Sequence, residues 1–293
     1  MQNTKHPIRI LTFDIEEWFN LLDIDASRSV AAWDSFERRI HENTDRILDL
    51  LTETGCGATF FCLGWVAQKY PEIIRKIDTA GYEIGSHTQE HQLAYEQTPE
   101  QFRSDLRTSI ENLEAITGKK VRCFRVPGFS ITESNTWALE LLADSGITID
   151  SSIFPAGRGH GGFASFGHSV PTIIKTTSGD LKEFPINTAE ILGKPVIFSG
   201  GGYFRLFPYP LIRNLTRKSP YVMTYFHPRD FDPKQPVLKR LPLHRRFKSY
   251  FGLSGALEKL RRLVTDFAFT DITGAEAAID WNAAPVVRIG DSE

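Results

Sequence analysis

Carboxylates crowd the end of an apolar run near the start of the sequence. In "ILTFDIEEWF", residues 10–19, Asp14, Glu16 and Glu17 follow a stretch that is typical of a buried strand. Because side chains alternate along an extended chain, Asp14 and Glu16 share one face, whereas a bulge after Asp14 would put Glu17 there instead. Two acids on one face allow one to bind a metal while the other acts as a base. The simpler interpretation is that these acids only cap the next element or pair with basic groups.

A second motif, "SHTQEHQ", has metal-type spacing, because His87 and His91 are four residues apart. If this segment turns helically, both imidazoles point the same way and can share a metal, although structural hydrogen bonding alone also explains such a pair. The metalloprotease pattern HExxH is absent, since Glu90 stands just before the second histidine. A catalytic zinc-type site needs a third ligand and an open position for water, and the acids of the first strand can supply that ligand.

Three further polar side chains lie at the ends of predicted strands. Arg125 lies in "VRCFRVP", Asp150 follows "ITI", and His227 follows "YVMTYF". In a parallel barrel the carboxyl ends of the strands open on one face, where active sites are built. We therefore expect these residues to lie beside Asp14 and His87.

The segment "GGGYFR" is a weaker candidate for contact with substrate. Its glycines allow close approach, so Tyr203 and Arg205 are predicted to contact the substrate. Turn structure alone explains the glycines equally well.

Apolar runs rich in β-branched and aromatic residues alternate with helical patterns, which indicates βα units around a mostly parallel sheet. Helices are predicted over 36–51 and from a capping box at Thr98, and glycines at 55, 81, 118 and 146 end helical patterns. No glycine-rich nucleotide loop follows the first strand, so the pattern favours a closed or nearly closed barrel. The predicted strands are 8–13, 57–63, 82–86, 121–126, 147–152, 170–177, 194–199 and 221–226.

The bulk composition is that of a globular protein without a strongly charged partner. The chain has 293 residues and a formal net charge of -2, which gives no general attraction to nucleic acid. The sequence has no signal peptide and no apolar stretch of membrane-spanning length, so a cytoplasmic enzyme is expected. The three cysteines, Cys56, Cys62 and Cys123, are predicted to be reduced core residues.

The ordered motifs "TFDIE", "SHTQEH", "RVPGFS", "DSS" and "YFHP" resemble those of the polysaccharide deacetylases with a NodB homology domain. The resemblance implies an α/β fold, a distorted (β/α) barrel of about seven strands. The barrel is expected over residues 1–230, with 231–293 as an extension packed on it rather than an independent domain. Members of the family remove acetyl groups from sugars with a divalent metal, for which zinc is expected first and cobalt, nickel or manganese are alternatives.

The resemblance also implies a role for each motif residue. Asp14 corresponds to the catalytic base, His87 and His91 to metal ligands, Arg125 to the group that holds the base, and His227 to the general acid. We expect Asp150 to be a partner of Arg125 and not a reactant.

One motif departs from the family pattern, and it concerns the third metal ligand. Most members have two adjacent aspartates in the first motif, whereas Ile15 follows Asp14 here and Glu16 stands two residues on. Glu16 is therefore predicted as the third ligand, with Glu17 as the alternative.

The carboxyl-terminal part resembles the branch associated with exopolysaccharide export and exosortase systems. This resemblance implies an N-acetylated glycan as substrate, a place in the cytoplasm or at the inner face of the membrane, and no nucleic-acid partner. The basic run from residue 228 fits either a solvated helix face or a patch for an anionic ligand or membrane surface. The sequence leaves open whether the protein forms a homo-oligomer.

Two alternative functions remain open for this sequence. Related barrels hydrolyse small cyclic amides or ureides, and a catalytically silent carbohydrate-binding protein would keep the same fold. The second alternative is disfavoured because Asp14 and His227 are both present, and a binding module needs neither a base nor an acid.

Overall fold

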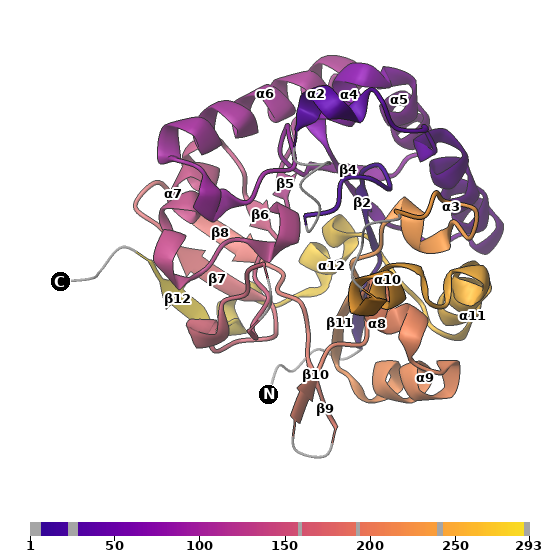
Figure 1. Cartoon of the computed structure of the whole chain (residues 1–293). Coiled ribbons are helices and arrows are strands. Elements are labelled where there is room, and N and C mark those ends of the chain that lie inside the picture. Colours follow the sequence, from indigo (N-terminus) through magenta and orange to yellow (C-terminus); the bar gives the residue numbers. More distant parts are fainter. Residues whose placement is uncertain (1–6, 23–28, 158–159, 192–193, 239–242, 290–293) are drawn as a thin grey trace.

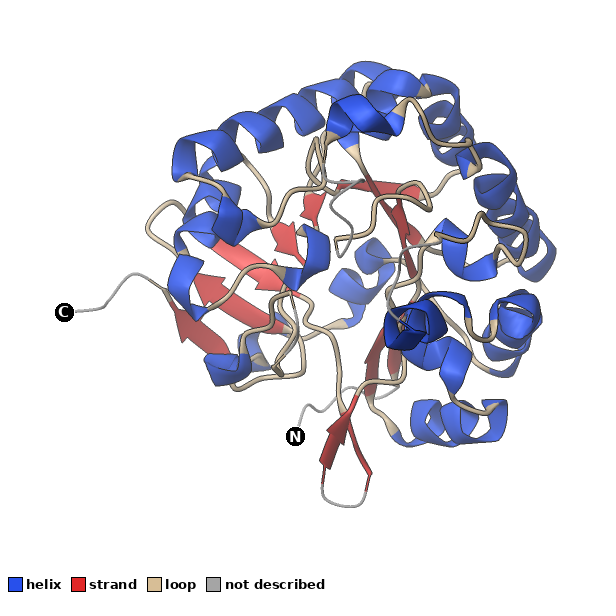
Figure 2. Ribbon diagram, viewed as in Figure 1, coloured by secondary structure: helices blue, strands red, loops and turns tan. Residues whose placement is uncertain are grey.

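The computed structural model describes residues 7–22, 29–157, 160–191, 194–238 and 243–289. Strands form a curved central sheet, and helices cover its outer side (Figures 1 and 2). The main sheet has eight strands in the order β12-β7-β8-β6-β5-β4-β3-β2. Its strands are β2 (Thr12–Ile15), β3 (Thr59–Cys62), β4 (Glu83–Ser86), β5 (Cys123–Phe124), β6 (Ile149–Asp150), β7 (Thr172–Lys175), β8 (Asp180–Glu183) and β12 (Val286–Arg288).

A break at Leu11 divides the first predicted strand and bends the sheet toward closure. Before the break, β1 (Ile8–Ile10) pairs in parallel with β11 (Tyr221–Met223), and after it β2 pairs in parallel with β3. The first strand therefore joins the last strand of the barrel to the rest, and a parallel bridge between Phe13 and Phe226 extends that contact. The distorted (β/α) barrel predicted from the sequence is confirmed.

The helices begin and end at sequence signals. Thr98 and Gln101 form the predicted capping box at the start of α6 (Pro99–Thr117), and Gly55 and Gly118 are left-handed C-caps. The other helices are α2 (Val30–Trp33), α3 (Ile40–Thr54), α4 (Gly64–Lys69), α5 (Pro71–Thr79), α7 (Trp137–Asp144), α8 (Gly201–Leu206), α9 (Tyr209–Lys218), α10 (Leu243–Tyr250), α11 (Ala256–Asp266) and α12 (Ile272–Ala278).

Two predicted strands are not the parallel members of the main sheet that the βα pattern led us to expect. The segment 170–177 contains β7, which runs antiparallel to β8 and lies outside it, and 194–199 contains β10 (Lys194–Val196), paired with β9 (Ala189–Ile191) in a separate hairpin. The strand β8 was missed because "DLKE" is mostly polar, although Leu181 and Glu183 are buried. Tertiary position overrides local β-propensity here.

The carboxyl-terminal segment packs on the barrel through several elements. Helix α11 lies against α3 and α9, α12 lies against β1, and β12 extends the sheet by pairing in parallel with β7. The expected boundary at residue 230 stays a prediction. All three cysteines are buried and unpaired, as predicted. Within the described ranges no helix is both long and apolar enough to cross a membrane.

Candidate active site

Three side chains at the carboxyl ends of β2 and β4 converge on one point. Oε2 of Glu16 lies 2.5 Å from Nε2 of His91 and 3.9 Å from Nε2 of His87. One ligand atom from each of the three residues lies within 4.8 Å of the others, and all three side chains are buried. Glu16 Oε2 is buried, and its short contact with His91 does not have the geometry of a hydrogen bond. A buried carboxylate oxygen that faces two imidazole nitrogens suits a divalent cation with an open coordination position.

The protonation states fit such a ligand set. Burial lowers the pKa of His87 to about 4, so its imidazole is neutral at pH 7. Its Nδ1 lies 2.8 Å from the carbonyl oxygen of Arg125, which can only accept a hydrogen bond. Nδ1 therefore carries the hydrogen of the neutral ring, and Nε2 faces Glu16 without one. Burial raises the pKa of Glu16, but the neighbouring histidines, His91 foremost, together outweigh burial and the net pKa is lowered.

The histidine loop is not the helical turn that the spacing suggested. Thr88 and His91 have left-handed backbone conformations, with φ values of 68° and 55°, and residues 87–93 form no helix. Thr88 Oγ1 accepts the N–H of His91 at 3.2 Å. The two imidazoles therefore meet because of a tight, strained loop, which local sequence rules do not predict for threonine and histidine.

A carboxylate on α6 fixes this loop, and sequence reasoning missed it. Asp105 accepts the backbone N–H groups of Gln89 at 2.7 Å and Glu90 at 3.1 Å. Burial raises the pKa of Asp105 to about 6. Asp105 lies within an amphipathic helix, where an acid is ordinary, so only the contact between loop and helix reveals its role.

Glu17 has a structural role and faces away from the metal candidates. Its carboxylate accepts the backbone N–H groups of Arg39 at 3.0 Å and Ile40 at 3.2 Å, at the start of α3. No bulge interrupts β2, so Glu16 shares a face with Asp14 as the extended alternative predicts. The capping interpretation therefore applies to one of the three acids.

A buried arginine holds Asp14. The guanidinium of Arg125, which is 0% exposed, donates from Nη1 to Asp14 Oδ1 and to Thr12 Oγ1, both at 2.7 Å. Its other side donates to Ser151, from Nη2 to Oγ at 2.9 Å and from Nε to the carbonyl oxygen at 3.2 Å. Burial raises the pKa of Asp14, but the charge and hydrogen bond of Arg125, together with the nearby histidines, outweigh burial and leave the net pKa lowered. Asp14 is therefore ionised at neutral pH.

Asp150 is not the partner of Arg125 that we expected. Ser151, one residue later, makes the contacts to Arg125, while Asp150 accepts from the Ser152 hydroxyl at 2.5 Å. Side chains alternate in β6, so a shift of one residue moves the contact to the other face. Burial raises the pKa of Asp150 to about 6, and burial together with Asp150 raises that of Glu183 well above its usual value.

His227 faces the acids from the neighbouring segment, because Phe226 before it is bridged in parallel to Phe13 before Asp14. Its Nε2 lies 3.7 Å from Asp14 Oδ2 and 3.9 Å from Glu16 Oε1. Its Nδ1 lies 3.2 Å from Oδ2 of Asp230, in the short helix η5 (Pro228–Phe231). Burial lowers the pKa of His227, but the hydrogen bond to Asp230 and the charge of Glu16 outweigh burial and raise it to about 9. His227 therefore carries a proton at neutral pH.

The "GGGYFR" segment supports His227 and does not contact the site directly. Arg205 is buried, and its Nε lies 3.1 Å from Oδ1 of Asp230, so its contact with substrate stays a prediction. A Cβ on Gly201 would lie 2.4 Å from Asp230 Oδ2, so this glycine permits the close approach of the carboxylate. Tyr203 is 46% exposed and its ring faces Phe207.

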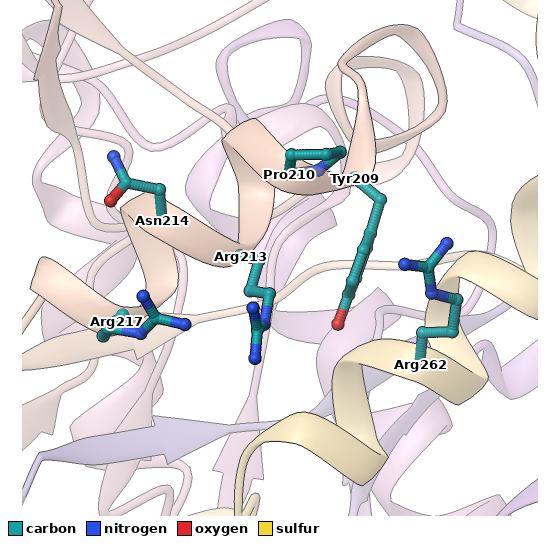
Figure 3. Close-up of a pocket in the computed structure, with 6 residues that line it drawn as sticks. All are labelled: Tyr209, Pro210, Arg213, Asn214, Arg217 and Arg262. Carbon is teal, nitrogen blue, oxygen red and sulfur yellow. The ribbon is translucent and has the colours of Figure 1, made fainter.

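A separate surface hollow between α9 and α11 is unrelated to this constellation. Its lining is basic and holds no carboxylate or histidine that could serve the chemistry above (Figure 3). The lining residues are Tyr209, Pro210, Arg213, Asn214, Arg217 and Arg262.

A barrel with two histidines, a carboxylate, a base and an acid at one rim has the parts of a metal-dependent hydrolase. Comparison with family models assigns the two halves of the chain separately. Residues 3–148 match the model described as polysaccharide deacetylase, and residues 151–276 match one described as a domain of unknown function, DUF3473. The segment 3–148 therefore belongs to the polysaccharide deacetylase family, and a DUF3473 segment follows it.

Curated relatives match about a third of the chain. A peptidoglycan-N-acetylglucosamine deacetylase of Bacillus cereus is 34% identical over 100 residues, which is 34% of this chain and 36% of that protein. A chitooligosaccharide deacetylase of Azorhizobium caulinodans is 34% identical over 85 residues, 29% of this chain and 40% of that protein. The matches thus span well under half of these relatives.

One solved structure shares the fold over the full length. It is a protein of Mycobacterium smegmatis, provisionally described as a polysaccharide deacetylase, with a TM-score of 0.66, 20% identity and 100% coverage of both chains. At this identity the likeness establishes the fold, including the part of the chain beyond residue 148.

Proposed function

We propose that this protein is a metal-dependent hydrolase that removes acetyl groups from N-acetylated sugars of a polysaccharide or a lipid-linked glycan precursor. One observation carries the proposal. His227 Nε2 lies 3.7 Å from Asp14 and 3.9 Å from Glu16, and Glu16 converges with His87 and His91. A base, an acid and a cation site therefore surround one small volume, as amide hydrolysis requires.

The chain's own residues divide the proton transfers between them. Asp14, ionised and held by Arg125, accepts the proton of the attacking water. His227, protonated and oriented by Asp230, donates a proton to the departing amine, which is a poor leaving group as an anion. When bound, a divalent metal at Glu16, His87 and His91 would polarise the acetyl carbonyl and acidify the water.

Zinc is the metal we propose first. Two neutral imidazole nitrogens and one carboxylate leave an open position, which is the usual arrangement of catalytic zinc. Cobalt, nickel and manganese accept the same ligands and stay alternatives. The family consists of metalloenzymes, which supports a metal but does not distinguish among these.

The relatives support an N-acetylated glycan as substrate. The proteins from Bacillus cereus and Azorhizobium caulinodans are named for deacetylation of peptidoglycan N-acetylglucosamine and of chitooligosaccharide. Hydrolysis of small cyclic amides is the competing activity, and trials with both substrate classes separate the two. Cytoplasmic localisation and a homo-oligomer stay predictions.

The test removes the base while keeping the metal. Asp14→Asn is expected to retain the metal, measured by elemental analysis, and to lower acetate release from N-acetylglucosamine oligosaccharides by at least ~100-fold, because general base catalysis typically contributes 10²–10⁴. Asp144→Asn, an exposed aspartate on α7, is the matched control and should keep full activity. Equal activity of Asp14→Asn and the unmodified chain would refute the assignment of the base.

A further inference from the structure

Large apolar side chains that remain exposed gather in one region of the surface. Among the described residues seven such side chains are exposed, and five of them belong to α8, α10 and the loops that adjoin α10. Phe247 is 52% exposed and Phe251 45% exposed, with ring centroids 4.7 Å apart. Exposed apolar residues scattered singly need no explanation, whereas a concentration of them indicates an interaction surface. We call this set the apolar patch: Tyr203, Leu206, Val237, Phe247 and Phe251.

The elements of the apolar patch are joined by hydrogen bonds. Arg205 of α8 donates to the carbonyl oxygens of Lys248 at 3.0 Å and Phe251 at 2.8 Å, which ties α8 to the end of α10. The hydroxyl of Tyr250 accepts the N–H of Leu238 at 3.0 Å and so holds the loop that contains Val237. Helices α8 and α10 lie together in Figure 1. The patch is therefore built on connected elements.

Cations accompany the apolar patch. Arg246 and Lys248 of α10 are exposed. Lys234 is exposed as well, and residues 233–238 and 246–257 contain no Asp or Glu. Lys259 of α11 donates to the carbonyl oxygens of Phe204 and Phe207 at the end of α8.

The basic hollow lies one helical turn further along α11. Arg262 follows Lys259 by three residues and lines the hollow together with Arg213 and Arg217 (Figure 3). Arg213 is partly neutralised, because its Nε lies 2.6 Å from Asp266. The surface around the apolar patch thus carries an excess of positive charge.

We propose that the apolar patch docks on an anionic lipid surface. Aromatic side chains that stand beside Lys and Arg are the composition of a helix that lies in a membrane interface, where the rings enter the headgroup boundary and the cations pair with lipid phosphates. A second copy of this chain is the less suitable occupant, because a two-fold contact through this face would place cations against cations.

The position of the apolar patch relates it to the active site. Arg205 contacts the end of α10 and also lies 3.1 Å from Asp230, which orients His227. Two residues, Arg205 and Asp230, thus connect the apolar patch to His227. Docking would hold the rim of the barrel near the membrane, where a glycan on a lipid carrier is presented; this last step rests on the proposed function.

Vesicle sedimentation tests the docking without measuring turnover. The full chain is mixed with vesicles of phosphatidylcholine alone, or of phosphatidylcholine with phosphatidylglycerol, and the bound fraction is measured. Binding is expected only with phosphatidylglycerol. The double variant Phe247→Ser and Phe251→Ser should bind at least ~10-fold more weakly, since two half-exposed rings lose their apolar contact. Arg246→Gln with Lys248→Gln should weaken binding by about fivefold for each cation.

Matched controls lie on the other side of the barrel. Val286→Ser changes an exposed apolar residue on the edge strand β12, and Arg107→Gln with Lys120→Gln removes two exposed cations at α6. These variants should bind as the unmodified chain does. Thermal unfolding of every variant verifies that it is folded.

Three outcomes would overturn the docking proposal. They are no binding to either vesicle, equal binding to both, and a dimer in solution that Phe247→Ser with Phe251→Ser dissociates. The last outcome would assign the patch to contact between copies. Loss of acetyl hydrolysis without loss of vesicle binding would count against the proposed function alone.

Discussion

Neighbouring acids in the first motif have different tasks because alternation places them on opposite faces. Glu16 faces two histidines, whereas Glu17 accepts backbone N–H groups at the start of α3. Both are buried, so neither composition nor exposure distinguishes them. Their partners do.

The two glutamates should respond differently to loss of charge. Glu16→Gln is expected to weaken metal affinity by at least ~10-fold, since even changes to groups that only support a ligand cost ~10–100-fold. Glu17→Gln should leave metal affinity nearly unchanged and lower the melting temperature, because the cap of α3 is weakened. Competition titration with a chromogenic chelator measures both. The reverse result would make Glu17 the ligand.

The acid His227 depends on Asp230 for its proton at neutral pH. Asp230→Asn removes a hydrogen bond and a charge that raise the pKa of His227 to about 9, so that pKa should fall. Activity requires the protonated imidazole, and the basic limb of the pH profile of kcat/KM should therefore move to lower pH. Asp232→Asn, at a neighbouring buried aspartate paired with Arg39, is the control. An unmoved basic limb in Asp230→Asn would show that another group is the acid.

Beneath the site, β6 and β8 are joined by a pair of buried carboxyl groups. Burial raises the pKa of Asp150 to about 6, and burial together with Asp150 raises that of Glu183 well above its usual value, so the pair keeps a proton that ordinary carboxylates lose. Ser151 lies between this pair and Arg125, so the strands that carry the pair also position the holder of the base.

This carboxyl pair should make folding stability depend on pH. The folded state keeps a carboxyl proton that the unfolded chain releases near the usual carboxyl pKa of about 4. The free energy of unfolding therefore falls as the pH rises from about 4 through about 6 and above. Glu183→Gln supplies a permanently neutral partner. Its melting temperature is expected to fall less between about pH 5 and pH 9 than that of the unmodified chain. The same pH dependence in both, with the exposed Glu111→Gln as control, would contradict a shared proton.

The site as a whole is assembled by closure of the barrel. Asp14 lies in the segment that matches the polysaccharide deacetylase model and His227 in the DUF3473 segment, and they meet because β1 pairs with β11 while β2 pairs with β3. Arg125 and the histidine loop are added by the strands between them.

A metal that binds only the closed barrel should stabilise the whole chain. Zinc in excess of its dissociation constant is expected to raise the melting temperature, by mass action on the folded state. His87→Ala and His91→Ala should lose that rise, and His41→Ala, at an exposed histidine paired with Glu72, should keep it. Calorimetry with and without a chelator measures the effect. An undiminished rise in either ligand variant would exclude that histidine from the metal site.

The barrel, most of its strands and the motif residues that meet at its rim could be predicted from the sequence alone. These follow from local rules: alternation in a strand puts Asp14 with Glu16, and capping residues such as Thr98 begin helices. Three contacts are visible only in the folded structure. Ser151 holds Arg125, Arg205 supports Asp230, and Asp105 fixes the histidine loop. These contacts join residues distant in the chain, and a shift of one residue or the approach of a neighbouring element changes them without altering any local pattern.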